Sequence, residues 1–181
     1  MKKIADKFFP VVHYIQYFLK ALPSSGHGIH SPFIFSFSTK VLHDKKLYQE
    51  YNIVKKLKKK LFNNNQTITL QGFGSKSDQN NGKITTIHKL AELTSVSEKY
   101  GKLLFRVVKY FQPKSILELG TSLGISTIYM SLANNKTKIT TVEGEAELDG
   151  IIRKGFSETQ CSNINLIIDD FDHFLNYSFQ A

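Results

Sequence analysis

The sequence predicts an α/β protein in which a parallel sheet follows an N-terminal helical leader. Three short apolar runs are the predicted strands, at residues 115–119, 138–143 and 164–168. Apolar residues recur every three or four positions between these runs, and this spacing predicts helices. Strands and helices that alternate in this way form a βαβαβ unit with right-handed crossovers. We therefore expect a partial parallel sheet with strand order 3-2-1.

The leader is expected to occupy residues 1–66, and the sheet-bearing domain residues 67–181. Apolar side chains between Phe8 and Leu22 recur at helical spacing. Ser31-Pro32 has the form of an N-cap followed by proline at the first helical position, which predicts a second helix.

A third helix is predicted to start near Leu47. Its apolar stripe is Leu47, Tyr51, Val54, Leu57 and Leu61. The residues after this helix, TITLQGFGS at 67–75, are expected to be extended and to lead into a glycine loop.

Two further helices are predicted before the first strand of the parallel sheet. ITTIHKLAEL, at residues 84–93, fits a short helix. Ser95-Val96-Ser97-Glu98 has the S-x-x-E form of a capping box and opens the next helix. The predicted core face of that helix is Leu103, Leu104, Val107, Val108 and Phe111, and Pro113 ends it.

Composition excludes several classes of protein. The chain has 181 residues, of which 41% are hydrophobic, so it can bury a core. The single cysteine, Cys161, excludes an internal disulfide framework and a cysteine-based zinc site. No apolar run approaches the roughly 18 residues that span a bilayer. These features favour a cytoplasmic protein without a membrane span.

The net charge of +9 belongs entirely to the first third of the chain, since residues 1–62 hold 12 Lys and three acidic residues while the remainder is neutral. Five of these lysines lie on one side of the third predicted helix: Lys55, Lys56, Lys58, Lys59 and Lys60. They could bind nucleic acid or acidic lipid, but a solvated helix face is the commoner interpretation. An RNA-binding face would also carry arginine and interleaved aromatic residues, and this face has no arginine.

The strongest chemical signal is a glycine loop after the first strand of the βαβ unit. Glu118, Gly120 and Gly124 form the pattern E-x-G-x-x-x-G, and the second strand ends in Glu143, 19 residues after Gly124. Such a loop lets a ligand approach the backbone at the carboxyl edge of the sheet. A carboxylate at Glu118 would repel a pyrophosphate but suits a cationic ligand. Glu143 can accept hydrogen bonds from both ribose hydroxyls, and by itself it fits NAD equally well.

The segment ILELGTSLGIST resembles motif I of the class I S-adenosylmethionine-dependent methyltransferases, which have a Rossmann-like sheet. With the preceding TSVSEKYGKLLFRVVKYFQP, it is similar to the catechol-O-methyltransferase-like branch. GHGIHSPF in the leader also resembles the N-terminal extension of a bacterial group within these enzymes. The resemblance implies a transferase that binds S-adenosylmethionine and methylates a small molecule. The acceptor is unknown: a small-molecule oxygen is one candidate, and oxygen and nitrogen both remain open.

The resemblance also implies the roles of six residues. Glu118, Gly120 and Gly124 would line the methionine and adenosine pocket, and Val96 would pack against the cofactor. Glu143 would bind the ribose, and Asp170 would meet the adenine amino group. Two departures concern Asp169, which replaces a small residue, and the loop from Gln71 to Ser75, which replaces an acidic one.

Length is the larger departure from the family. Its sheet has seven strands, whereas this chain ends where the third strand should finish, so we expect a truncated, cofactor-binding portion. The residues that would position an acceptor are missing, and the catalytic residues are unknown. An open sheet edge would also favour self-association.

Other readings remain beside this one. The chain could be a non-catalytic remnant that keeps the cofactor pocket, or a basic RNA-associated protein. His27 and His30 could form a metal pair, but a structural role is favoured and no metal is predicted. Asp169, Asp170 and Asp172 resemble a metal cluster, yet they follow a strand directly and are expected to cap the next turn.

Overall fold

The computed structural model describes residues 31–71 and 82–178, and the chain divides into two compact units, Met1–Asp44 and Lys45–Ala181. In the first unit, α2 (Pro32–Phe37) continues into the π-helix η1 (Ser38–Leu42). The Ser31 side chain caps α2 by accepting from the Ile34 amide, and Pro32 is its first residue, as predicted. The helix predicted between Phe8 and Leu22 and the pair His27 and His30 lie outside the described residues.

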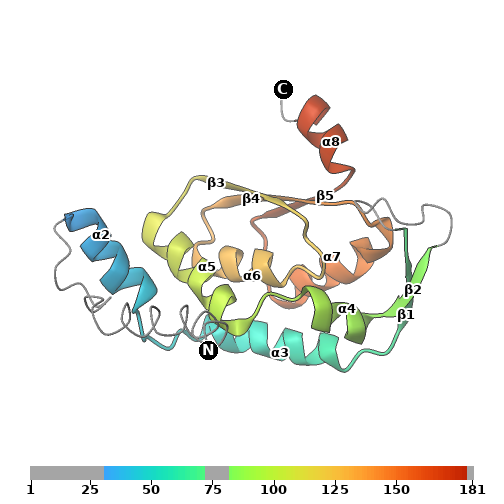
Figure 1. Ribbon diagram of the computed structural model, residues 1–181, viewed down its shortest axis with the longest axis horizontal. Coiled ribbons are helices and arrows are strands. Elements are labelled where there is room, and N and C mark those ends of the chain that lie inside the picture. Colours follow the sequence, from blue (N-terminus) through green and yellow to red (C-terminus); the bar gives the residue numbers. More distant parts are fainter. Residues whose placement is uncertain (1–30, 72–81, 179–181) are drawn as a thin grey trace, which may run out of the picture. The chain divides into compact units, whose positions relative to one another are not determined.

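The second unit holds the remaining elements (Figure 1). In chain order, its helices and strands are α3 (Glu50–Phe62), β1 (Thr67–Leu70), β2 (Lys83–Thr86), α4 (Ile87–Thr94), α5 (Glu98–Phe111), β3 (Ser115–Leu119), α6 (Ile125–Ala133), β4 (Lys138–Glu143), η2 (Ala146–Leu148), α7 (Asp149–Glu158), β5 (Ile164–Ile168), α8 (Phe171–His173) and η3 (Phe174–Ser178). Within the described ranges, none of these helices is long and apolar enough to cross a bilayer.

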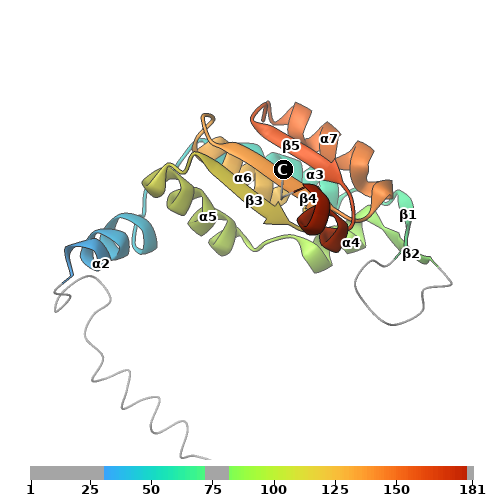
Figure 2. The same ribbon diagram turned by 90° about the horizontal axis from the view of Figure 1, so that it is seen from above.

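The main sheet is three-stranded and parallel, in the order β3-β4-β5, and Figure 2 shows β4 between its two neighbours. This confirms the predicted α/β class. Ile116 pairs with Ile139, which pairs with Ile164, and this row faces the core. The next row, which begins at Leu117, faces the other side, because successive side chains of a strand alternate.

Helices α5, α6 and α7 lie on one side of this sheet, and α8 lies on the other (Figure 1). Gly101 of α5 lies against Tyr129 of α6, where a Cβ atom would overlap the tyrosine ring. A glycine at position 101 therefore lets α5 and α6 pack closely. Burial between these helices raises the pKa of the Tyr129 hydroxyl to about 12.

Helix α3 belongs to the second unit, which begins at Lys45. Tyr51, Val54, Leu57 and Leu61 of α3 are buried in the core, as their spacing predicts. Leu47 is 92% exposed and precedes the helix, so its predicted place in the stripe is wrong.

Two other local predictions need correction. Residues 84–86 belong to β2, which pairs antiparallel with β1, so the predicted helix at 84–93 starts only at Ile87. Helix α5 is capped by Ser97, whose side chain accepts from the Tyr100 amide, and not by Ser95. Of the predicted core face, Val108 is buried, whereas Phe111, the last residue of the helix, is 49% exposed; Phe105, which the prediction omitted, is fully buried.

Candidate functional site

The loop between β3 and α6 has a backbone that favours glycine at two positions. Gly120 has φ +93° and Gly124 has φ +76°, both in the left-handed region where a side chain is strained. Ser122 also has a positive φ, of +49°. The sequence predicted the two glycines, whereas the serine between them has no signal in the pattern. A non-glycine residue in this conformation is uncommon and is often found at functional sites.

Hydrogen bonds and packing hold this loop at the carboxyl end of the sheet. The amides of Gly120 and Thr121 donate to the Val142 carbonyl at 2.9 and 3.3 Å. A Cβ atom at Gly124 would lie 2.7 Å from Cε1 of Phe156 in α7. The chain thus passes too close to α7 for any residue larger than glycine.

Glu143 ends β4 beside the loop, and its side chain is buried at 7% exposure. Its Oε2 accepts from the Ser122 amide at 2.6 Å, and its Oε1 accepts from the Glu145 amide at 3.0 Å. Two backbone amides therefore set the orientation of the carboxylate. A carboxylate has about four lone-pair positions, so both oxygens can still accept from a ligand hydroxyl.

Three hydroxyl groups surround the carboxylate of Glu118, which lies near the end of β3. Its Oε1 accepts from the Ser126 hydroxyl at 2.6 Å, and its Oε2 accepts from the hydroxyls of Thr127 and Thr141 at 2.5 and 2.7 Å. Thr141 also bonds the Thr121 hydroxyl at 2.6 Å. These bonds connect β3, β4 and α6, and one acceptor position of the Glu118 carboxylate remains.

A small cleft of about 60 Å³ lies in front of the loop. Val96 and Gly120 of the predicted residues border it, and the other lining residues are Thr94, Ser95, Thr121, Ser122, Leu123, Ile125 and Ser126. None of these residues is a lysine or an arginine. Val96 packs against the core, and its carbonyl accepts from the Lys58 ammonium at 3.0 Å.

The chemistry of these groups fits a nucleoside with positive charge better than a dinucleotide. A pyrophosphate would meet no lysine or arginine in the lining of the cleft, and the carboxylates of Glu118 and Glu143, which accept from Ser126 and Ser122 of that lining, would repel it. A Cβ atom at Gly120 would meet only the Phe171 ring, at 3.9 Å, so the space beside this glycine is open to a ligand.

Asp170 caps α8, which confirms the prediction that it caps the turn after the strand. Its Oδ1 accepts from the amides of Asp172 and His173 at 2.9 and 3.1 Å. Asp169 binds Nδ1 of His173 through Oδ2 at 2.7 Å. Across residues 31–71 and 82–178, no group of three or more His, Cys, Asp or Glu side chains is arranged to hold a metal ion.

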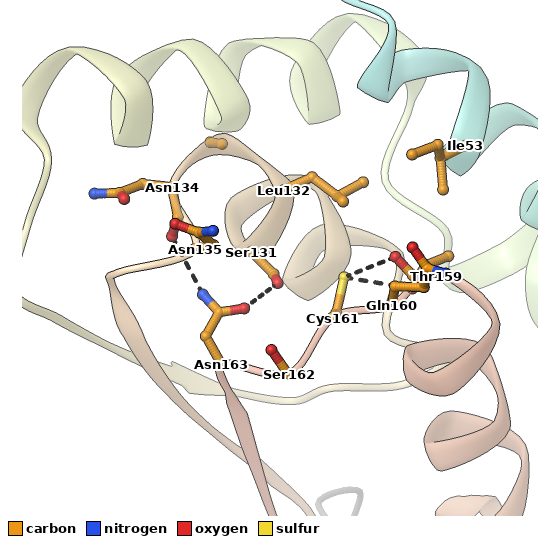
Figure 3. Close-up of a pocket in the computed structure, with 11 residues that line it drawn as sticks. Ile53, Ser131, Leu132, Asn134, Asn135, Thr159, Gln160, Cys161, Ser162 and Asn163 are labelled. Carbon is orange, nitrogen blue, oxygen red and sulfur yellow. Dashed lines mark hydrogen bonds between the residues drawn. The ribbon is translucent and has the colours of Figure 1, made fainter.

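Another cavity lies at the opposite end of the strands, where the loops leading into β4 and β5 meet (Figure 3). It has a volume of about 430 Å³. Asn163 accepts from the Ser131 hydroxyl and donates to the Asn134 carbonyl, and Cys161 lies close to Thr159. These polar groups satisfy one another, and ligands of parallel sheets bind at the carboxyl ends of the strands. The loop after β3 therefore remains the candidate site.

No protein-family model matches the sequence, and no curated protein matches it. Among solved structures, the chain is similar to a Klebsiella pneumoniae protein described as an O-methyltransferase, with 18% identity, a TM-score of 0.47 and coverage of 76% of this chain and 50% of that one. The O-methyltransferase TomG of Streptomyces achromogenes, in complex with SAM, has 18% identity, a TM-score of 0.45 and coverage of 79% and 51%.

A third similar structure is a Staphylococcus aureus protein described as a caffeoyl-CoA O-methyltransferase, with 19% identity, a TM-score of 0.43 and coverage of 50% and 46%. All three structures are described as O-methyltransferases. The chain spans about half the length of these structures. The function proposed below rests on the side chains at the carboxyl edge of the sheet.

Proposed function

We propose that this chain is the cofactor-binding portion of an S-adenosylmethionine-dependent methyltransferase with a small-molecule acceptor, an oxygen atom being favoured. The observation that carries the proposal is the carboxylate of Glu143. It is buried, oriented by the amides of Ser122 and Glu145, and placed beside a glycine loop whose cleft has no lysine or arginine. This arrangement suits a ribose attached to a cationic group rather than to phosphates.

Six residues have proposed roles in binding the cofactor. Glu143 would accept from the ribose hydroxyls, and Gly120 and Gly124 would let the ligand approach the backbone. Val96 would supply an apolar contact across the cleft. Glu118 would attract the cationic cofactor through its negative charge and could accept one hydrogen bond from it at its remaining acceptor position. Asp170 would accept from the adenine amino group through Oδ2, since Oδ1 caps α8.

The cofactor, when bound, supplies a methyl group on a sulfonium, which an acceptor atom displaces in line. The chain's own part is to hold the nucleoside and to keep anionic groups near the sulfonium. We further propose that residues 1–66 are a basic leader to a cytoplasmic enzyme and that residues 67–181 form the first half of its sheet, with strand order 3-2-1.

Replacement of Glu143 by alanine should weaken the binding of S-adenosylhomocysteine. A hydrogen bond to a charged group contributes about 1.5–3 kcal/mol, so the loss of one ribose contact lowers affinity about 10- to 150-fold. Isothermal titration calorimetry measures this change. Glu147→Ala is the matched control, because Glu147 is an exposed carboxylate on the neighbouring η2. Equal affinities of wild type and a folded Glu143→Ala protein would exclude the ribose role.

The choice of cofactor predicts which ligand stabilises the protein. S-adenosylmethionine should raise the Tm, because the anionic groups near the cleft favour a cationic nucleoside, whereas NAD should leave it unchanged. A thermal-shift comparison at equal ligand concentrations measures both. Stabilisation by NAD alone would overturn the methyltransferase proposal.

We also propose that the chain self-associates through the outer edge of β3. The Lys138 amide donates to the Lys114 carbonyl, and the Gly120 amide donates to the Val142 carbonyl, so even-numbered residues face β4. The peptide groups of Ser115, Leu117 and Leu119 therefore point outward, where no strand of the described part of the chain pairs with them.

A non-catalytic remnant is the second candidate function. It needs only the cleft beside the glycine loop and no acceptor site. Cofactor binding without turnover over a broad acceptor panel would support this candidate. Turnover with any acceptor would exclude it.

A further inference from the structure

A cavity of about 160 Å³ lies between α3 and α7, and the proposed methyl transfer gives it no role. Its apolar wall is formed by Leu57, Leu61, Leu123 and Ile151. Leu57 and Leu61 come from α3, Leu123 from the glycine loop and Ile151 from α7. The three leucines are buried in the core, so the packing of the protein fixes this wall before any ligand binds.

Two glycines of α7 border the cavity and leave it open. A Cβ atom on Gly150 would meet nothing within 4 Å, and one on Gly155 would lie 3.5 Å from Leu57. Glycine is among the least favourable residues in a helix. Helix α7 therefore gives up local stability at two positions that border this cavity.

The rim of the cavity carries a net positive charge. Lys60 of α3 pairs with Glu158 of α7 at 2.8 Å, and Lys154 lies one turn before Glu158 on the same helix. The hydrogen bond from Lys60 lowers the pKa of the Glu158 carboxyl, which is therefore ionised at neutral pH. Two ammonium groups thus accompany one carboxylate. Among residues 31–71 and 82–178, Lys154 forms no ion pair, so its charge is available to an anion.

Size and charge together select a class of ligand. A cavity of about 150 Å³ can hold a benzene ring, so this cavity admits one ring or a short alkyl chain. The side chains of Asn64 and Gln66 also border it. Oδ1 of Asn64 accepts from the Gln66 amide at 2.9 Å, so its Nδ2 remains to donate to a ligand oxygen. An apolar body with one carboxylate matches both the wall and the rim.

We propose that this cavity binds a small monocarboxylate with an aryl or short alkyl body, and that this ligand stabilises the glycine loop through Leu123. Leu123 lines both this cavity and the cleft in front of the loop. Phe156, which follows Gly155, lies against Gly124 at the end of the same loop. A ligand that contacts Leu123 thus orders a side chain that the cleft also uses, and such coupling between two sites is reciprocal.

Ligand-observed saturation-transfer NMR with 3-phenylpropionate and hexanoate tests the cavity. Both should bind the wild type with a Kd of about 1 mM or lower. Acetate, which lacks the apolar body, and 3-phenylpropanol, which lacks the charge, should bind at least about threefold more weakly. If neither 3-phenylpropionate nor hexanoate binds, the proposal is overturned.

Variants locate the binding. Gly150→Leu should fill the cavity and abolish binding while it keeps or raises the Tm, since leucine favours a helix over glycine. Lys154→Gln should weaken carboxylate binding about three- to tenfold. Lys136→Gln is the matched control, because Lys136 is exposed on the loop before β4 and does not line the cavity. Equal binding by Gly150→Leu and wild type would contradict this site.

The effect on the glycine loop rests on the proposed function and has its own measurement. Saturating 3-phenylpropionate should raise the affinity for S-adenosylhomocysteine about fivefold in calorimetry, and Gly150→Leu should lose this effect. If wild type binds no S-adenosylhomocysteine, the proposed function fails and the coupling fails with it, whereas carboxylate binding is judged by NMR alone. If wild type binds S-adenosylhomocysteine equally well with and without the carboxylate, only the coupling is overturned.

Discussion

Gly124→Ala is expected to lower the free energy of unfolding by about 2–5 kcal/mol. Gly124 has φ +76°, and a left-handed conformation costs a residue with a Cβ about 1–2 kcal/mol. The new Cβ would also lie 2.7 Å from the Phe156 ring, and overpacking of this kind costs about 1–3 kcal/mol. For a chain of this size, the Tm should fall by roughly 5–20 °C.

Gly150→Ala is the matched control for this prediction. Gly150 lies within α7, its φ is not positive, and a Cβ there would meet nothing within 4 Å. Alanine is favoured over glycine in a helix by up to about 1 kcal/mol, so this variant should keep or raise the Tm. Phe156→Leu combined with Gly124→Ala should recover part of the loss by removing the overlap. A Gly124→Ala protein that melts with the wild type would contradict the contact with α7.

The wild-type protein is expected to form oligomers at micromolar concentration, and a charge on β3 should dissociate them. Leu117 and Leu119 are 38% and 44% exposed on the side of the sheet away from α5, α6 and α7. Neither lysine nor proline, which natural edge strands use against pairing, occurs within Ser115–Leu119. Glu118 gives no protection either, because its carboxylate is bound to three hydroxyls on the other face.

Size-exclusion chromatography with light scattering measures this self-association. Leu117→Lys should shift the protein to a monomer, because pairing would bring a charge to the edge. Leu93→Lys is the control, since Leu93 is 69% exposed on α4, away from the sheet. It should leave the oligomer unchanged. A wild-type protein that is monomeric across the concentration range would contradict self-association.

Local signals in the chain predicted the strands well. The strands β3, β4 and β5 have the predicted bounds, because each is a short apolar run between turn or helix signals. The start of α3 and the cap of α5 were predicted less well. Leu47 fits the apolar stripe of α3 but precedes the helix, and Ser95 and Ser97 are equally good caps by residue type. Periodicity alone does not define a helix end.

The role of Glu118 shows what a motif leaves open. The pattern E-x-G-x-x-x-G placed a carboxylate near the loop and suggested that it lines the ligand pocket. In the structure, the hydroxyls of Ser126, Thr127 and Thr141 donate hydrogen bonds to this carboxylate. Thr141 comes from β4, so its proximity to Glu118 depends on strand pairing and not on sequence spacing.

The sequence by itself determined the α/β class, the position of the glycine loop and the carboxylate at the end of the second strand. The α/β class depends on local periodicity. The glycine loop depends on residues that can adopt a positive φ, which few residue types other than glycine do. Only the tertiary structure decided which groups meet at the carboxyl edge. The amide of Ser122 reaches Glu143, and Phe171 reaches Gly120, because parallel pairing brings the ends of β3, β4 and β5 together. Both contacts join residues that are far apart in the chain, so they depend on packing, which no local pattern encodes.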